Sequence, residues 1–239
     1  MPNTFQSSNT LESRSSRPIS QNAFLRCTPS DKLLSIHAPH NISAIHRFIA
    51  VCFFQEHQAK IDHFLPELIT LTSHNNTPYA ALGYQSAAEH ALFLEQYLDT
   101  PIDVTISTAH GAAVQRSTVF EVGNLAASHP GSTLRLILSL STFFYEHGFR
   151  WLAVTMTQQV HHQFQRLGLE SSLYRIAPAT RSRLLNTSTD WGTYFNNKPY
   201  VYVASIEDAL SLMRRSPLLA QLIDRGLTPQ NDHAITLEA

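Results

Sequence analysis

Charged residues and cysteines are both scarce in this sequence. Lys, Arg, Asp and Glu make up 15% of its 239 residues, and cysteine occurs only at Cys27 and Cys52. Two cysteines cannot build a disulfide framework, so a reducing compartment is expected. The 13 histidines form no His-Glu-x-x-His pattern, and no Cys-x-x-Cys pattern is present. Ligand spacing therefore predicts no metal site.

Long apolar runs are missing as well. No stretch of about 18 apolar residues occurs, so no membrane-spanning helix is predicted. No apolar segment follows the basic residues near the N-terminus, as a secretory signal would require. The formal net charge is −1, whereas nucleic-acid-binding proteins normally carry a basic excess. We therefore expect a cytoplasmic protein with no transmembrane segment and no nucleic-acid partner.

The chain does contain enough apolar material for a sizeable core. Its residues are 43% hydrophobic and 10% aromatic, which is typical of a globular protein. Residues 1–30 are rich in Ser, Asn, Arg and Pro and are expected to form a disordered tail. Residues 31–216 are predicted to form the folded domain, followed by a loosely ordered segment over residues 217–239.

Hydrophobic periodicity predicts a chain of mixed helices and strands. Helical spacing covers residues 41–57, 87–98, 132–147, 158–167 and 206–215. Strand patterns cover residues 65–72, 79–86, 105–107, 117–125, 151–156, 173–176 and 200–204. Pro101 is expected to end the second helix. Such an order without a repeat indicates an α/β or α+β fold, in which helices flank a central mixed sheet.

The stretch 119–140 is the one around which the rest of the chain is expected to be organised. An apolar strand carries one carboxylate, Glu121, reaches Gly123 and crosses a short Pro-Gly loop. A helix then begins at Ser132 and Thr133, which are good capping residues. The first N–H groups of a helix lack internal partners and attract anions. The stretch therefore indicates either a phosphate or pyrophosphate site or an ordinary strand-to-helix turn.

Four segments in order resemble the thermostable hemolysin family of bacterial proteins: Leu92–Leu98, Glu121–Ala126, Phe164–Gly168 and Trp191–Tyr194. The resemblance runs from about residue 42 to residue 205. More distantly, the arrangement is similar to the GNAT-type acyltransferase fold, and particularly to acyl-homoserine-lactone synthases and long-chain N-acyl amino acid synthases. That similarity implies a GNAT-like α/β fold with a twisted mixed sheet. It also implies acyl-CoA or the phosphopantetheine of an acyl carrier protein as co-substrate, with no tightly bound cofactor.

The resemblance assigns a donor site to the organising stretch. The strand would offer its backbone to the pantetheine arm, and the loop and helix start would hold phosphates. The residues concerned are Val122, Gly123, Leu125, Ala126, Gly131, Ser132 and Thr133. The glycine-rich phosphate signature of GNAT proteins is replaced here by Ala-Ser-His-Pro-Gly. This departure favours a carrier-protein donor over free coenzyme A.

Two residues of the same strand are the predicted catalytic groups. Glu121 corresponds by position to a glutamate of the homoserine-lactone synthases and would take the proton of an attacking amine. The alternative is a buried structural acid paired with an arginine. Asn124 stands where those synthases carry an arginine. An asparagine can bind an acceptor by hydrogen bonds but cannot neutralise its charge, so the acceptor is expected to differ from theirs.

Three further residues are predicted to bind substrate. Arg47 lies on the first helix, where the synthases also carry an arginine; the alternative is an ordinary surface arginine. Trp191 and Tyr194 would form an aromatic wall that serves either the core or a ligand.

The leading hypothesis is an acyltransferase that moves a fatty acyl group from a carrier-protein or coenzyme A thioester to a small amine or amino acid. One alternative is a protein that lyses membranes directly. Another is a GNAT-like module that binds an acyl carrier protein without turnover. Acyl length, acceptor and oligomeric state are left open.

Overall fold

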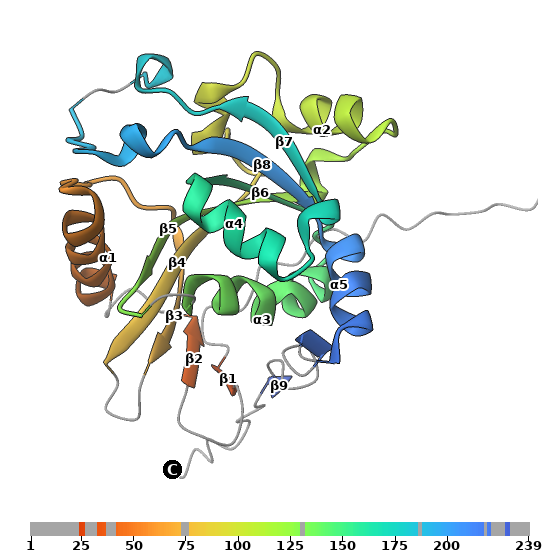
Figure 1. Ribbon diagram of the computed structural model, residues 1–239, viewed down its shortest axis with the longest axis horizontal. Helices are drawn as coiled ribbons and strands as arrows, with labels where there is room; N and C mark the ends of the chain where they lie inside the picture. Colours follow the sequence, from red (N-terminus) through yellow and green to blue (C-terminus); the bar gives the residue numbers. More distant parts are fainter. Residues whose placement is uncertain are drawn as a thin grey trace, which may run out of the picture.

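A single sheet runs through the molecule (Figure 1). The computed structural model describes residues 24–26, 33–36, 42–72, 77–129, 132–185, 188–217, 219–220 and 228–229. Within them nine strands are ordered β7-β8-β6-β5-β4-β3-β2-β1-β9. Their bounds are Phe24–Arg26 (β1), Leu33–Ile36 (β2), Glu67–Thr72 (β3), Pro78–Ser86 (β4), Val119–Ala127 (β5), Trp151–Met156 (β6), Leu173–Pro178 (β7), Tyr200–Ser205 (β8) and Thr228–Pro229 (β9).

One pair of neighbouring strands differs from the others. β5 and β6 are parallel, whereas every other pair recorded in the described sheet is antiparallel. A parallel pair needs a crossover connection, and helix α3 (Ser132–Glu146) provides it. The organising stretch of the sequence, residues 119–140, therefore comprises β5 and most of this crossover helix.

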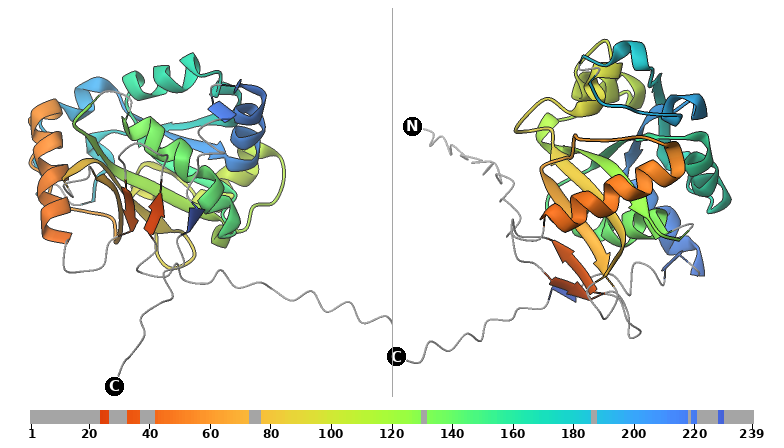
Figure 2. Two further views of the ribbon diagram at one scale, coloured as in Figure 1. Left: turned by 90° about the horizontal axis from the view of Figure 1, so that it is seen from below. Right: turned by 90° about the vertical axis from the view of Figure 1, so that its left-hand side faces the viewer.

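Helices cover both faces of the sheet (Figures 1 and 2). Phe120 and Val122 of β5 point to a core shared with α3, α4 (Gln158–Arg166) and α5 (Ile206–Arg215). Side chains alternate along a strand, so residues 119, 121 and 123 face the opposite side.

That opposite face carries two separate clusters. One packs α1 (Ile42–His57) on β3, β4 and the end of β5. The other packs α2 (Ile102–His110) and the 3₁₀ turn η2 (Phe93–Tyr97) on β6 and β8. Glu121 therefore points between α1 and α2 toward η2, where the Leu94 N–H contacts its carboxyl group.

The sequence predictions fail in one region. Residues 87–98 form a turn and η2 instead of a helix, and residues 105–107 belong to α2 instead of a strand. Pro101 precedes the first residue of α2, a place that suits proline because its missing N–H would have had no partner. Ile102 and Ile106 are both fully buried at the spacing of one helical turn. The β-branched residues between them obscured this helical pattern.

The other predicted helices and strands are confirmed to within a few residues, as is the mixed α/β class with helices flanking a central sheet. Most of the predicted N-terminal tail and C-terminal segment lies outside the described residues, so the domain boundaries stay predictions. In the part of the chain that is described, no helix is long and apolar enough to cross a bilayer.

Candidate functional site

The central parallel strands separate part of the way along their length. β5 pairs with β6 from Val119 to Val122, opposite Trp151 to Val154. Beyond that register β5 continues to Ala127 and β6 to Met156. On its other side β5 carries a bulge against β4, and Asn124 within it has a left-handed φ of 50°. A bulge bends its strand and increases its twist, which here accompanies the divergence from β6.

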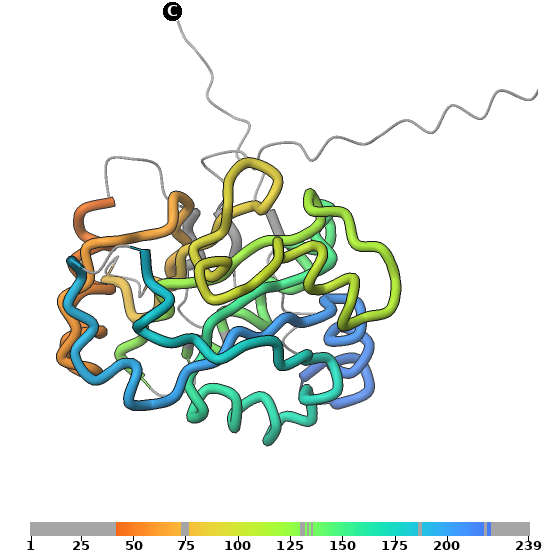
Figure 3. Tube along the Cα trace, turned by 90° about the horizontal axis from the view of Figure 1, so that it is seen from above, coloured from red at the N-terminus to blue at the C-terminus, as the bar shows by residue number. Residues whose placement is uncertain are grey.

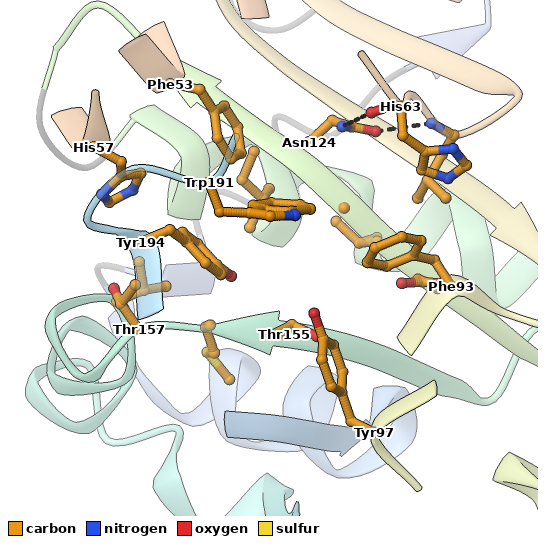
Figure 4. A pocket seen from close by; sticks show the side chains of 17 residues that line it. Phe53, His57, His63, Phe93, Tyr97, Asn124, Thr155, Thr157, Trp191 and Tyr194 are labelled. Carbon is orange, nitrogen blue, oxygen red and sulfur yellow. Dashed lines mark hydrogen bonds between the residues drawn. The ribbon is translucent and has the colours of Figure 1, made fainter. Parts of the chain in front are cut away.

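A cavity of about 130 Å³ occupies the space between the diverging strands (Figure 4). Its walls come from α1, the loop before β3, η2, β5, β6, the start of α4 and the turn before β8. The lining residues are Phe53, His57, His63, Leu65, Phe93, Tyr97, Glu121, Val122, Gly123, Asn124, Leu125, Thr155, Met156, Thr157, Val160, Trp191 and Tyr194.

Glu121 is the acidic group of this cavity. Its residue is 3% exposed, and Oε1 accepts a hydrogen bond from the backbone N–H of Leu94 at 3.2 Å. Oε2 is buried and has no hydrogen-bond partner. Burial raises the pKa of Glu121 to about 8, against the lowering effect of the Phe93 and Leu94 amides. A carboxyl with such a pKa exchanges its proton near neutral pH.

Two more buried polar atoms are left without partners in the same cavity. They are Oγ1 of Thr155 on β6 and Nε1 of Trp191 in the turn before β8. Buried polar atoms are nearly always hydrogen-bonded in native proteins. Three such atoms from three chain segments at one cavity therefore mark a place prepared for a polar ligand or for water.

Two tyrosines direct their hydroxyl groups toward the middle of the cavity. Figure 4 shows Tyr97 and Tyr194 approaching from different walls. Burial, and then the nearby Glu121, raise the pKa of Tyr194; burial, Tyr194 and Glu121 raise that of Tyr97. Both phenols therefore stay protonated and can donate hydrogen bonds at neutral pH.

A charged cluster fastens η2 beside Glu121. Glu95 accepts hydrogen bonds from the backbone N–H groups of Leu92 at 2.8 Å and Ile102 at 2.7 Å. Its two oxygens also bind Arg116, at 2.6 and 2.8 Å, and Arg116 reaches Asp103 at 3.1 Å. The acid bound to an arginine is therefore the partly buried Glu95, while the buried Glu121 forms no ion pair recorded among the described residues.

Backbone contacts hold the aromatic turn against the end of α1. Lys60 N–H donates to the carbonyl of Asp190 at 2.6 Å, and Thr193 N–H donates to that of His57 at 2.7 Å. Gly192 has a φ of 49°, and a Cβ there would collide with the backbone of His57 and Gln58. This close approach places the predicted aromatic residues of the turn, at positions 191 and 194, in the cavity wall.

η2 and the residues just after it contact a segment that is distant in sequence. Figure 3 shows the stretch around η2 and the stretch after β7 on the near side. Gln96 accepts a hydrogen bond from the Leu185 N–H at 2.9 Å, and Arg183 pairs with Asp99 at 2.8 Å. The η2 wall is therefore tied to the segment that leads into the aromatic turn.

Asn124 has contacts other than those expected of a substrate-binding group. Its Oδ1 accepts the Leu65 N–H at 2.8 Å, and its Nδ2 donates to the carbonyl of His63 at 3.1 Å (Figure 4). The amide thus bridges the bulge of β5 and the loop before β3. These two hydrogen bonds hold the loop at the cavity.

The predicted substrate residue of α1 lies elsewhere. Arg47 is exposed and is not among the lining residues. α1 instead contributes Phe53 and His57 to the cavity. Burial lowers the pKa of His57, so its ring is neutral at pH 7.

The predicted donor residues divide into two groups. Val122, Gly123 and Leu125 line the cavity, whereas Ala126 is buried in the cluster under α1. In the phosphate loop, Ser132 begins α3, Gly131 lies outside the described residues, and the side chain of Thr133 is likewise not described.

Several lining residues were not singled out from the sequence. Phe93 and Tyr97 lie in a segment that the sequence predicts as a helix. They are four residues apart, which is also the spacing of neighbours on the apolar face of an amphipathic helix. Thr155 offered a clearer signal, because it is the one polar residue of the apolar strand Trp151–Met156. No cluster of three metal-ligand side chains occurs among the residues described.

Comparison with known proteins gives a family and a fold. The profile of the family described as thermostable hemolysin matches residues 37–210. No curated protein matches the chain by sequence. Among solved structures, the N-acyl amino acid synthase FeeM from uncultured soil microbes superposes with a TM-score of 0.54 at 16% identity, over 79% of this chain and 97% of FeeM.

Two further solved structures match the chain. TofI gives a TM-score of 0.50 at 14% identity, over 79% of this chain and 98% of TofI. The AHL synthase LasI gives 0.49 at 12% identity, over 74% and 91%. The likeness to FeeM and TofI concerns the fold, and the GNAT-like architecture expected from the sequence is confirmed.

Proposed function

Because the chain belongs to the thermostable hemolysin family and has a GNAT-like fold, we propose that it is an acyltransferase. It moves an acyl group from an acyl-carrier-protein or acyl-CoA thioester to a small amine or amino acid. The observation that carries this proposal is the buried carboxyl of Glu121, which has one oxygen unpaired at a cavity between diverging parallel strands.

Glu121 acts as the general base. An amine must lose a proton to attack a thioester carbonyl, and a group with a pKa near the working pH does this best. The pKa of about 8 suits this task. Oε1 is held by the Leu94 N–H, which leaves Oε2 for the amine.

The cavity also offers donors to the thioester oxygen. Negative charge develops on that oxygen as the amine adds, and preorganised donors stabilise it. Trp191 Nε1 and Thr155 Oγ1 are both buried and unpaired at the cavity. The phenols of Tyr97 and Tyr194 supply further hydrogen bonds.

The donor thioester enters along the diverging strands. Its pantetheine arm lies against Val122, Gly123 and Leu125, and its phosphate lies toward the start of α3 at residues 131–133. The donor is a co-substrate, so no tightly bound cofactor is needed. Since acyl thioesters of this kind are made in the cytoplasm, the proposal places the protein there.

Direct assay tests the proposal. The purified protein is incubated with acyl carrier protein or coenzyme A carrying short to long acyl chains, together with a panel of amines and amino acids, and amide products are identified by mass spectrometry. We expect amide formation by the wild type and by Glu207→Gln, which changes an exposed acid on α5. We expect Glu121→Gln to bind the donor normally and to lose most of the rate.

The same variants separate the alternatives. A module that binds acyl carrier protein without turnover would give no amide and would be insensitive to Glu121→Gln. A protein that lyses membranes directly would release haemoglobin from erythrocytes when applied without any thioester donor, and the substitution would leave that release unchanged.

A further inference from the structure

The cavity holds one acidic side chain and no lysine or arginine among its 17 described lining residues. The guanidinium of Arg116 is already bound to Glu95 and Asp103. Arg47 lies exposed on α1, outside the lining. A carboxylate in this cavity would therefore meet no permanent positive charge from the described lining.

The two histidines of the lining have amide and aromatic neighbours. Burial lowers the pKa of His57, which is neutral at pH 7, and its Nδ1 lies 3.4 Å from Nδ2 of Asn197. His63 is exposed at the cavity edge, where its ring stacks on Phe93 with 4.9 Å between centroids. Both rings are thus engaged by uncharged neighbours.

Aromatic rings form a connected wall beside Glu121. Phe93 contacts Tyr97 and Trp191, with ring centroids 6.4 and 6.2 Å apart, and Trp191 contacts Tyr194 at 5.4 Å. Aromatic faces attract cations, most of all that of Trp. An ammonium group would find both this wall and the unpaired oxygen of Glu121.

We infer that the acceptor is a small primary amine with an apolar or aromatic body and no carboxylate. This inference rests on the proposed function and specifies its substrate. It follows from the groups of the lining, because burying an anion without a partner is costly, whereas an ammonium meets aromatic faces and favours the ionised form of the Glu121 carboxyl beside it. The cavity of about 130 Å³ is close to the roughly 150 Å³ that accommodates benzene in an engineered core, which limits the size of the body.

The reaction balances with such an acceptor. The amine nitrogen forms a bond to the thioester carbonyl carbon, and the carbon–sulfur bond breaks. Of the two protons that an ammonium loses, one passes to the departing thiolate and the other passes through Glu121 to solvent. The products are a neutral amide, a thiol and one proton.

Matched acceptors test the inference with the full chain. Phenethylamine, phenylalanine and phenylalanine methyl ester share one body, and isobutylamine and valine form a smaller pair. Acyl transfer to each is followed by mass spectrometry with the donors of the activity assay, and calorimetry measures binding of each acceptor without donor. We expect the amines and the ester to be used, with kcat/KM for each free amino acid lower by at least roughly 100-fold.

The outcomes separate the inference from the proposed function. Equal or better use of the free amino acids would overturn the inference and leave the acyltransferase in place. Rejection of the methyl ester together with phenylalanine would show that bulk decides, and would also overturn it. Selective binding of amines with no amide product would support this acceptor class while removing the proposed function. Absence of both binding and product would overturn both.

Discussion

Two glutamates, Glu95 within η2 and Glu121 beside it, have opposite environments. Glu95 binds one guanidinium and two backbone N–H groups, whereas Glu121 binds one backbone N–H and leaves an oxygen unpaired. Burial alone would raise the pKa of Glu95, but Arg116 and the amides of Ile102 and Leu92 lower it; burial raises that of Glu121 to about 8. Glu95, whose two oxygens are both hydrogen-bonded, therefore supports the structure of the site. Glu121, which has one oxygen without a partner, is left available for chemistry.

The largest effect is expected from Glu121→Gln. Glutamine keeps the shape of the protonated acid but cannot take a proton, so kcat should fall by about 10²- to 10⁴-fold while the donor Kd stays within a few fold. Single-turnover kinetics and donor titration measure the two quantities. A large loss of donor affinity instead of rate would show that this residue only supports the binding site.

Arg116→Met should show that the Glu95 cluster is structural, because we expect this substitution to destabilise the fold. It leaves the mostly buried Glu95 without its cation, and we expect the free energy of unfolding to fall by about 2–3 kcal/mol in denaturant titrations. The double variant with Glu95→Gln should recover part of this loss, because no uncompensated charge remains. If the double variant is less stable than Arg116→Met, the cluster is not held together by charge.

The pH dependence of the two acids should have opposite signs. The folded-state pKa of Glu121 lies above its ordinary value of 4.5, so its contribution to stability should decline from about pH 4.5 to pH 8 and be absent in Glu121→Gln. The contribution of Glu95 should be lost as the pH falls below 4.5, because its pKa is lowered. Denaturant unfolding of the wild type, Glu121→Gln and Glu95→Gln across this pH range tests whether the two contributions change in opposite directions.

Activity should follow the ionised form of Glu121. With a pKa of about 8, the basic form increases roughly tenfold from pH 7 to pH 9, so kcat/KM should rise by about that factor and then level off. His57, with its lowered pKa, and the two tyrosines, with raised ones, do not titrate in this interval. A rate that continues to rise tenfold per pH unit above pH 9 would indicate titration of the amine alone.

The smallest effect is expected from adding a cation at the cavity edge. His63→Arg should raise kcat/KM for phenylalanine relative to phenethylamine by about fivefold, as one exposed charge pair contributes roughly 1 kcal/mol. His63→Gln is the matched uncharged control and should leave the ratio unchanged. An equal shift in both variants would mean that loss of the imidazole, not the new charge, altered selectivity.

The sequence predicted the central strand, crossover helix and parallel strand well, because their apolar periods are long and uninterrupted. It also indicated Glu121, a single carboxylate in an apolar strand. The region 87–118 was misread because Glu95 and Arg116 organise it by contacts across 21 residues, and no local period reports such contacts. The tie between Asn124 and the loop at 63–65 spans still more of the chain, so the role of this asparagine became visible only in three dimensions.

The divergence of β5 from β6 has a consequence for the timing of catalysis. The gap belongs to the hydrogen-bonded scaffold itself, so among the described residues it exists before any ligand arrives. Encounter with the donor should therefore follow a single kinetic phase whose rate rises linearly with donor concentration, as expected for a rigid receptor.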